Sequence, residues 1–166
     1  MYTLLMANPN AKKNVSSQNI EDIFRIRPHA LKFISSMAQH FELVIYSSRK
    51  RNNVKKMRNI LDPEHIYIMD MLYKENCYMT ESKKYVKDLS LIQNRSIRDC
   101  LILDYKPQSF AFCLGNGIPI LHWNGDQTDQ ELIPGLMEYL VELSNVNDVR
   151  KENLKKMSYD SYLPKE

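Results

Sequence analysis

Three short polar segments of the sequence each follow an apolar run, and together they hold side chains whose types could support chemistry. The segments are Ala7–Lys12, Ser47–Arg49 and Asp104–Pro107. They supply asparagine amides, a serine hydroxyl beside a cation, and a carboxylate, respectively. In open α/β sheets, ligands bind beyond the carboxyl ends of the parallel strands. If the preceding runs are such strands, the sequence predicts a ligand site where these segments meet.

The elements that would position these segments alternate between apolar strands and amphipathic helices. The sequence predicts strands at Tyr2–Met6, Phe41–Tyr46, His65–Met69, Cys100–Leu103 and Ile118–Leu121. It predicts helices after Pro28, over Asn52–Leu61 and over Glu131–Leu143, and a hairpin within Leu72–Val86. This alternation indicates an α/β fold, with a mainly parallel central sheet flanked by helices and a small β-hairpin insertion.

Length and composition limit the class of protein. The chain has 166 residues, 43% hydrophobic and 26% charged, which is an ordinary balance for one globular domain. We expect one domain over residues 1–150 and a C-terminal tail over residues 151–166. No apolar run reaches the roughly 18 residues of a membrane span, and the N-terminus lacks the order of a secretory signal. A net charge of +3 is too small to indicate nucleic-acid binding by itself.

The cysteines and histidines do not form a metal-binding pattern. Cys77, Cys100 and Cys113 are odd in number and widely spaced, which argues against a disulfide framework or a zinc site. The four histidines are scattered along the chain. The sequence therefore predicts free thiols in a reducing compartment and no metal ligands of these types.

Several separate segments share their order and spacing with one family of phosphatases. They are Ile26–His29, Leu43–Ser48, Leu61–Pro63, Leu72–Cys77, Tyr85–Ser90, Leu101–Asp104, Asn116–Ile120 and Val146–Arg150. Over residues 26–151 the chain resembles the FCP/SCP-type (NLI-interacting-factor-like) phosphatase domain of the haloacid dehalogenase superfamily. The resemblance implies a haloacid dehalogenase-like Rossmannoid fold. It also implies a magnesium-dependent enzyme that dephosphorylates phosphoserine in protein tails such as that of RNA polymerase II.

The catalytic motif of that family is altered in this chain. The family carries D-x-D at the end of its first strand, where the first Asp attacks phosphorus, the second is the general acid and base, and magnesium bridges them. The best alignment places Asn8 and Asn10 at these positions, and a shift of one residue places Ala7 and Pro9 there. Neither register supplies a carboxylate, since no Asp or Glu precedes Glu21. A neutral amide is a poor nucleophile and does not exchange protons near pH 7.

A second motif of the family is altered as well. The family has Asp-Asn or Asp-Asp after the buried strand, and its second member helps to hold magnesium, whereas this chain has Asp104-Tyr105. Ser47 and Lys87 stand where the family has a phosphate-binding hydroxyl and a phosphate-neutralising lysine. Two interpretations stay open. Either a Lys87–Asp104 pair only joins two loops, or Ser47, Lys87 and Asp104 form a phosphate-binding remnant.

A basic run within and before the second predicted helix is a candidate partner surface. Six basic residues and no acidic one lie between Leu43 and Leu61. They are Arg49, Lys50, Arg51, Lys55, Lys56 and Arg58. Such a run is most often a solvated helix face, but it could also contact an acidic partner or RNA. No aromatic residues interleave with it, so it matches no recognisable nucleic-acid-binding module.

The sequence as a whole predicts a catalytically inactive phosphatase-like domain without magnesium, which serves as a structural or interaction subunit of a larger protein assembly. Its expected partners are other protein subunits rather than nucleic acid or a membrane. Two alternatives stay open: an active magnesium-dependent phosphoserine phosphatase with an atypical site, and a phosphoprotein reader without hydrolysis. We expect an intracellular location, with the nucleus, the cytoplasm and the mitochondrion all compatible with the sequence.

Overall fold

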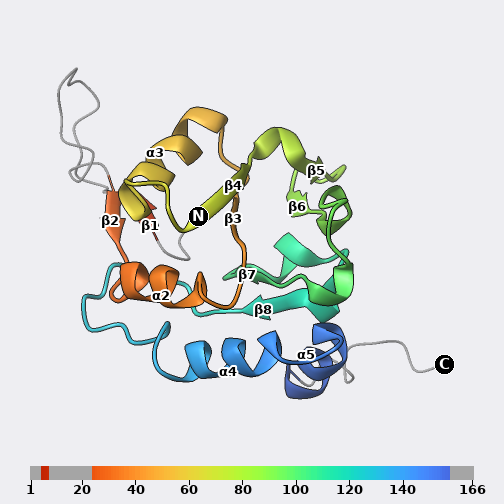
Figure 1. The fold of residues 1–166 in the computed structure, drawn as a ribbon. Coiled ribbons are helices and arrows are strands. Elements are labelled where there is room, and N and C mark those ends of the chain that lie inside the picture. The colour runs from red at the N-terminus through yellow and green to blue at the C-terminus, as the bar shows by residue number, and fades with distance from the viewer. Residues whose placement is uncertain (1–4, 8–23, 158–166) are drawn as a thin grey trace.

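The computed structural model describes residues 5–7 and 24–157. The strands are β1 (Leu5–Ala7), β2 (Phe24–Ile26), β3 (Leu43–Tyr46), β4 (Ile68–Leu72), β5 (Cys77–Met79), β6 (Tyr85–Lys87), β7 (Ile102–Asp104) and β8 (Gly117–Pro119). The α-helices are α2 (Ala30–Met37), α3 (Arg51–Leu61), α4 (Gly135–Ser144) and α5 (Val149–Met157). Figure 1 shows α3 beside the β3–β4 pair, and α4 and α5 along the β7–β8 pair.

Parallel pairing joins β3 to β4 and β7 to β8. Tyr46 lies opposite Leu72 at the end of the first pair, and Asp104 lies opposite Pro119 at the end of the second. The pairs β1–β2 and β5–β6 are antiparallel. The α/β class and the predicted hairpin are therefore confirmed. However, the described strands form four two-stranded sheets and not one continuous central sheet.

The helices form where apolar side chains recur at helical spacing. In α3, Val54, Met57 and Leu61 lie on one face and are buried. The buried faces of α2 and α4 and the first residue of α5 meet the same core, so four helices share one apolar cluster with the parallel strands. Its members are Ala30, Phe33, Ile34, Met37, Ile45, Val54, Met57, Leu61, Ile68, Ile118, Ile120, Leu132, Leu140, Leu143 and Val149.

Several boundaries differ from those predicted. β4 begins at Ile68 rather than near His65, because the side chain of Asp62 binds the backbone N–H groups of residues 66–68 in the preceding turn. α4 begins at Gly135, directly after Pro134. The helix α5 continues to Met157 and so crosses residue 151, where the sequence analysis placed the start of a C-terminal tail. None of the described helices is long and apolar enough to cross a membrane.

Candidate functional site

An ion pair between Lys87 and Asp104 lies where β6 and β7 end. The Lys87 Nζ atom is 2.5 Å from Asp104 Oδ2, and both side chains are only 8% exposed. The other carboxylate oxygen, Oδ1, accepts the backbone N–H of Lys106 at 2.9 Å. Both oxygens of Asp104 are thus hydrogen-bonded within the chain. Because the pair is almost completely buried, each charge is compensated by the other and not by solvent.

Tyr46 fixes the position of this pair from the end of β3. Lys87 Nζ lies 5.9 Å from the centre of the Tyr46 ring. The Tyr46 hydroxyl donates to the carbonyl of Asn76 at 2.6 Å and accepts the N–H of Asp88 at 3.1 Å. Burial raises the pKa of Tyr46 to about 12, so its phenol stays protonated. Tyr46 therefore ties β3 to both ends of the β5–β6 hairpin that presents Lys87.

Ser47 follows Tyr46 and is 1% exposed. Its N–H continues the β3–β4 ladder to the carbonyl of Leu72 at 3.0 Å, and its hydroxyl oxygen accepts the N–H of Arg49 at 3.3 Å. These contacts fix the turn from β3 into α3. The hydroxyl therefore already acts as an acceptor within the turn.

Cys77 is a neighbour of this cluster that the sequence analysis did not assign to it. Its Sγ lies 3.9 Å from the carbonyl oxygen of Ser47, and Cys77 is the β5 partner of Lys87 in the hairpin. Burial raises the pKa of its thiol, and the nearby Lys87 charge opposes that rise without cancelling it. Cys77 is thus a protonated thiol. The only sequence signal for its place was its membership of the predicted hairpin.

Tyr105 packs as an aromatic side chain. Its ring meets the ring of His122 edge to face, with centroids 4.9 Å apart, and Lys106 Nζ lies 5.2 Å from the Tyr105 centroid. Magnesium requires several oxygen ligands in octahedral geometry. Around Asp104 the described residues offer a carboxylate that is already paired and a phenol in an aromatic contact. No group of three or more His, Cys, Asp or Glu side chains in the described part of the chain is placed to hold a metal ion. Asn8 and Asn10, predicted at this edge of the fold, lie outside the described residues.

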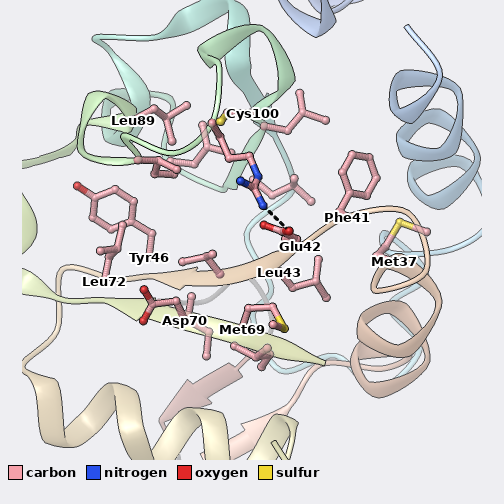
Figure 2. Close-up of a pocket in the computed structure, with 18 of the residues that line it drawn as sticks. Met37, Phe41, Glu42, Leu43, Tyr46, Met69, Asp70, Leu72, Leu89 and Cys100 are labelled. Atoms are coloured by element: carbon pink, nitrogen blue, oxygen red, sulfur yellow. Dashed lines mark hydrogen bonds and ion pairs between the residues drawn. The ribbon is translucent and has the colours of Figure 1, made fainter. Parts of the chain in front are cut away.

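A large apolar cavity separates β3 from the start of β7. Its volume is about 670 Å³. Residues 43–46 and residues 100–103 line it consecutively, so an edge of each of these two segments faces the cavity. Figure 2 shows Met37, Phe41, Leu43 and Met69 around this space, with the ion pair of Glu42 among the lining side chains. Arg95 supplies the partner of Glu42 at 2.5 Å. Among the predicted site residues that the structure describes, only Lys87 lines the cavity.

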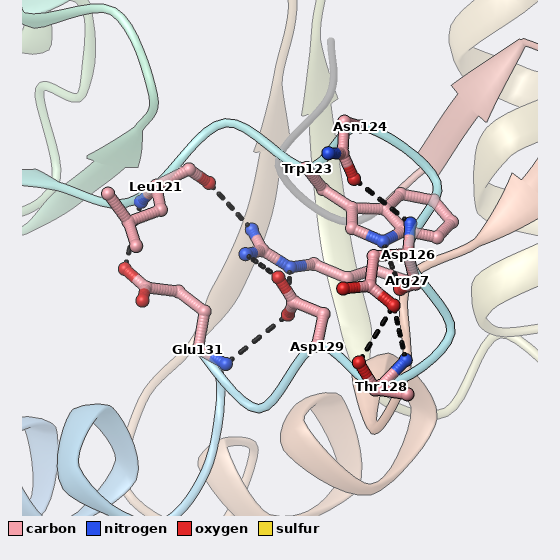
Figure 3. A network of polar contacts seen from close by, with 8 residues as sticks. All are labelled: Arg27, Leu121, Trp123, Asn124, Asp126, Thr128, Asp129 and Glu131. Atoms are coloured by element: carbon pink, nitrogen blue, oxygen red, sulfur yellow. Dashed lines mark hydrogen bonds and ion pairs between the residues drawn. The ribbon is translucent and has the colours of Figure 1, made fainter.

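A second buried charge, on Arg27, fastens the loop between β8 and α4. Arg27 Nε and one terminal nitrogen each donate to Asp129 at 2.7 Å, and the other nitrogen donates to the carbonyl of Leu121 at 3.0 Å (Figure 3). These contacts with Arg27 lower the pKa of Asp129 although partial burial opposes the change. The sequence analysis missed this pair, because 102 residues separate its members.

The basic run is divided between exposed and anchored side chains. Lys50, Arg51, Lys55 and Lys56 are exposed at the N-terminal half of α3. Arg58, in the last turn of α3, instead donates to the carbonyl of Ile68 at 2.6 Å and joins the helix to β4. Arg58 therefore serves the contact between α3 and β4, and the exposed part of the predicted partner surface ends before it.

The geometry can now be compared with known proteins. The family model for NLI interacting factor-like phosphatases matches residues 2–150, so the chain belongs to that family. The solved structure of Fcp1, an essential RNA polymerase II CTD phosphatase, superimposes with a TM-score of 0.59. That superposition covers 99% of this chain and 52% of Fcp1 at 15% identity, and it supports the haloacid dehalogenase-like fold.

Two of the curated relatives are named in different ways. CTD small phosphatase-like protein 3 of Caenorhabditis elegans is 41% identical over 66% of this chain and 37% of its own length. A Yarrowia lipolytica relative, the mitochondrial import inner membrane translocase subunit TIM50, is 36% identical over 84% of this chain and 29% of its own length. The chain therefore spans about a third of the length of these relatives.

Proposed function

We propose that this chain is a catalytically inactive phosphatase-like domain that serves as a structural or interaction subunit of a protein assembly. The observation that carries the proposal is the pairing of Asp104. Lys87 occupies one oxygen of this carboxylate and the Lys106 N–H occupies the other, in an almost fully buried position. A group held in this way contributes to the fold, and its charge is already neutralised.

The sequence supports the proposal at two further positions. Covalent phosphoryl transfer in this family requires an anionic nucleophile, whereas the chain has neutral Asn8 and Asn10 in the best alignment. Tyr105 replaces the second residue of the later acidic motif and makes an aromatic contact with His122. Each change removes a carboxylate or amide ligand from the place where magnesium would otherwise be bound.

A role within an assembly agrees with the names of the relatives. One group is named for phosphatases, and another is named as subunits of a mitochondrial translocase. A domain of this family can thus be part of a multi-subunit machine. In this chain a preserved core and altered acidic motifs favour the role of a subunit over the role of an enzyme.

Two measurements on purified protein test the proposal. The first is release of inorganic phosphate from a phosphoserine peptide with magnesium, with an active CTD small phosphatase as positive control. The second is calorimetry with the same peptide and its unphosphorylated form. We expect no turnover, and no difference in binding between the two peptides, because Lys87 is already paired.

Each alternative has its own result. Magnesium-dependent turnover that Asp104→Asn abolishes would show an active phosphatase with an atypical site and would overturn the proposal. Stronger binding of the phosphorylated peptide, lost in Lys87→Met, would show a phosphoprotein reader. That result would replace the interaction role with recognition of a phosphate group.

A further inference from the structure

We propose that Lys50, Arg51, Lys55 and Lys56, hereafter the cationic face, bind an acidic helical segment of a partner protein. This inference rests on the proposed function, since it names the class of partner for the interaction subunit. The cationic face occupies the N-terminal half of α3, which lies beside the β3–β4 pair in Figure 1.

The charges of the cationic face are not balanced within the described part of the chain. All four side chains are exposed, and the run from Leu43 to Leu61 contains no acidic residue. The ion pairs found among residues 24–157 use other cations. Lys155 on α5 illustrates the difference, because it pairs with Glu152 one turn earlier at 2.9 Å.

This arrangement is unfavourable for an isolated helix. Cations near a helix N-terminus oppose the helix dipole, yet Lys50 is the N-cap residue, Arg51 follows it, and the first turn has no acidic residue. Arg51 and Lys55 are four residues apart, so two like charges also face each other along the helix. Proteins usually depart from these rules of charge placement in helices at sites where function requires it. The carboxylates of an acidic partner would offset these repulsions with new attractions.

Aromatic contacts hold part of the surface in place. The Arg51 guanidinium lies over the ring of Tyr73 at 4.8 Å, and Lys74 lies over Tyr85 at 5.2 Å. The Lys74 N–H donates to the carbonyl of Arg49 at 3.0 Å, which connects the start of α3 to the turn after β4. Within the described residues, the buried Nε of Arg49 has no hydrogen-bond partner. A cation that is already ordered loses less entropy when it binds a carboxylate.

A protein helix fits this surface better than RNA. Sequence-independent RNA binding adds base stacking on free aromatic faces to phosphate contacts, but Tyr73 already carries Arg51. None of the exposed large apolar side chains belongs to α3, so recognition depends on charge. Arg51 and Lys55, one helical turn apart, match carboxylates that are four residues apart on a facing helix. Attraction of this kind is strong at low ionic strength and weakens as salt is added.

The test is direct binding to the full chain. The probe is an alanine-based helical peptide with glutamate at every fourth position, and the control peptide has glutamine there. The test variant combines Lys50→Gln, Lys55→Gln and Lys56→Gln. The matched variant combines Lys151→Gln, Lys155→Gln and Lys156→Gln on α5, so the net charge falls equally. Glutamine is a good helix former, so both variants keep their helices, which circular dichroism verifies.

We expect the glutamate peptide to bind at low salt and the glutamine peptide not to bind. Affinity should fall about tenfold in the α3 variant and change less than about twofold in the α5 variant. An equal loss in both variants would show a general charge effect and overturn the inference. So would absence of binding, or tighter binding of single-stranded polyuridylate that is lost in the α3 variant.

The outcome is separable from that of the proposed function. If the chain releases phosphate but the α3 variant alone loses peptide binding, the proposed function fails and the cationic face remains a binding surface. If no phosphate is released and no peptide binds, the chain keeps its inactive character and only the assignment of the partner fails.

Discussion

The charges around Asp104 and those on the cationic face of α3 are arranged in opposite ways. Lys87 and Asp104 are both buried and directly paired, so each charge is already compensated within the chain. Lys50, Arg51, Lys55 and Lys56 are exposed and have no acidic neighbour in their segment. The charges of Lys87 and Asp104 stabilise the fold as an ion pair. The charges of the cationic face are unfavourable for the fold and are exposed, within reach of a partner.

The comparison separates charges that are compensated within the fold from charges that are exposed to solvent. A buried ion pair contributes to stability because the loss of one member leaves the other charge buried and uncompensated. An unpaired exposed cluster contributes little to stability and determines which partners are attracted. The two ends of α3 repeat this contrast. Arg58 and Asp62 at the C-terminal end are bound internally, whereas the side chain of Lys50 at the N-terminal end makes no cap hydrogen bond among the described residues.

The largest effect should come from breaking the buried pair. Lys87→Met leaves the Asp104 carboxylate buried without its countercharge, so we expect a loss of about 3–5 kcal/mol in the free energy of unfolding. Urea denaturation measures it. Lys155→Met, which removes an exposed pair, should cost less than about 0.5 kcal/mol. Equal losses would show that Lys87–Asp104 is not a structural pair.

A smaller loss is expected at the second internal pair. Asp129→Ala removes both carboxylate acceptors from the guanidinium of Arg27, whose side chain is fully buried. Asp129 itself is 16% exposed, so we expect a loss of about 2–3 kcal/mol. Asp126→Ala, three residues earlier on the same loop, is the control in the same thermal or chemical unfolding experiment. If both variants lose the same amount, the Arg27 pair has no special role.

Asp62 should make stability depend on pH. Burial raises its pKa, but hydrogen bonds from the N–H groups of residues 66–68 and the charge of Arg58 outweigh this and lower the pKa below the ordinary 3.8. The stabilisation is therefore complete above that ordinary value and disappears as the pH falls through the folded-state pKa. Asp62→Asn should cost about 1–2 kcal/mol at neutral pH and less in acid. A cost independent of pH would exclude this role.

The smallest effect, of opposite sign, is expected on the cationic face. The backbone of Lys50 has the extended conformation of an N-cap, with no side-chain hydrogen bond. Lys50→Asp should therefore stabilise the isolated chain by about 0.5–1 kcal/mol while it weakens binding of an acidic peptide. Lys155→Asp, near the C-terminus of α5, should slightly destabilise the chain. Destabilisation by Lys50→Asp would mean that the lysine serves the fold.

Much of the fold could be predicted because its signals are local. The helix predicted over Asn52–Leu61 matches α3 to within one residue, and the run before Asp104 defined β7 within two residues. The sequence analysis considered a Lys87–Asp104 pair as one of two interpretations, and the structure places the two side chains in direct contact. The Arg27–Asp129 pair and the place of Cys77 could not be predicted. They depend on tertiary packing between distant segments, which leaves no periodic pattern in the sequence.

The central claim is that no group of this chain accepts a phosphoryl group. Intact-mass measurement after incubation with a phosphoserine peptide and magnesium, quenched in acid, tests this claim most directly. The account predicts an unchanged mass for the chain, under conditions in which an active CTD small phosphatase forms a phosphoryl adduct. A phosphoryl adduct on this chain, mapped to any of its residues and lost in Asp104→Asn, would contradict the account.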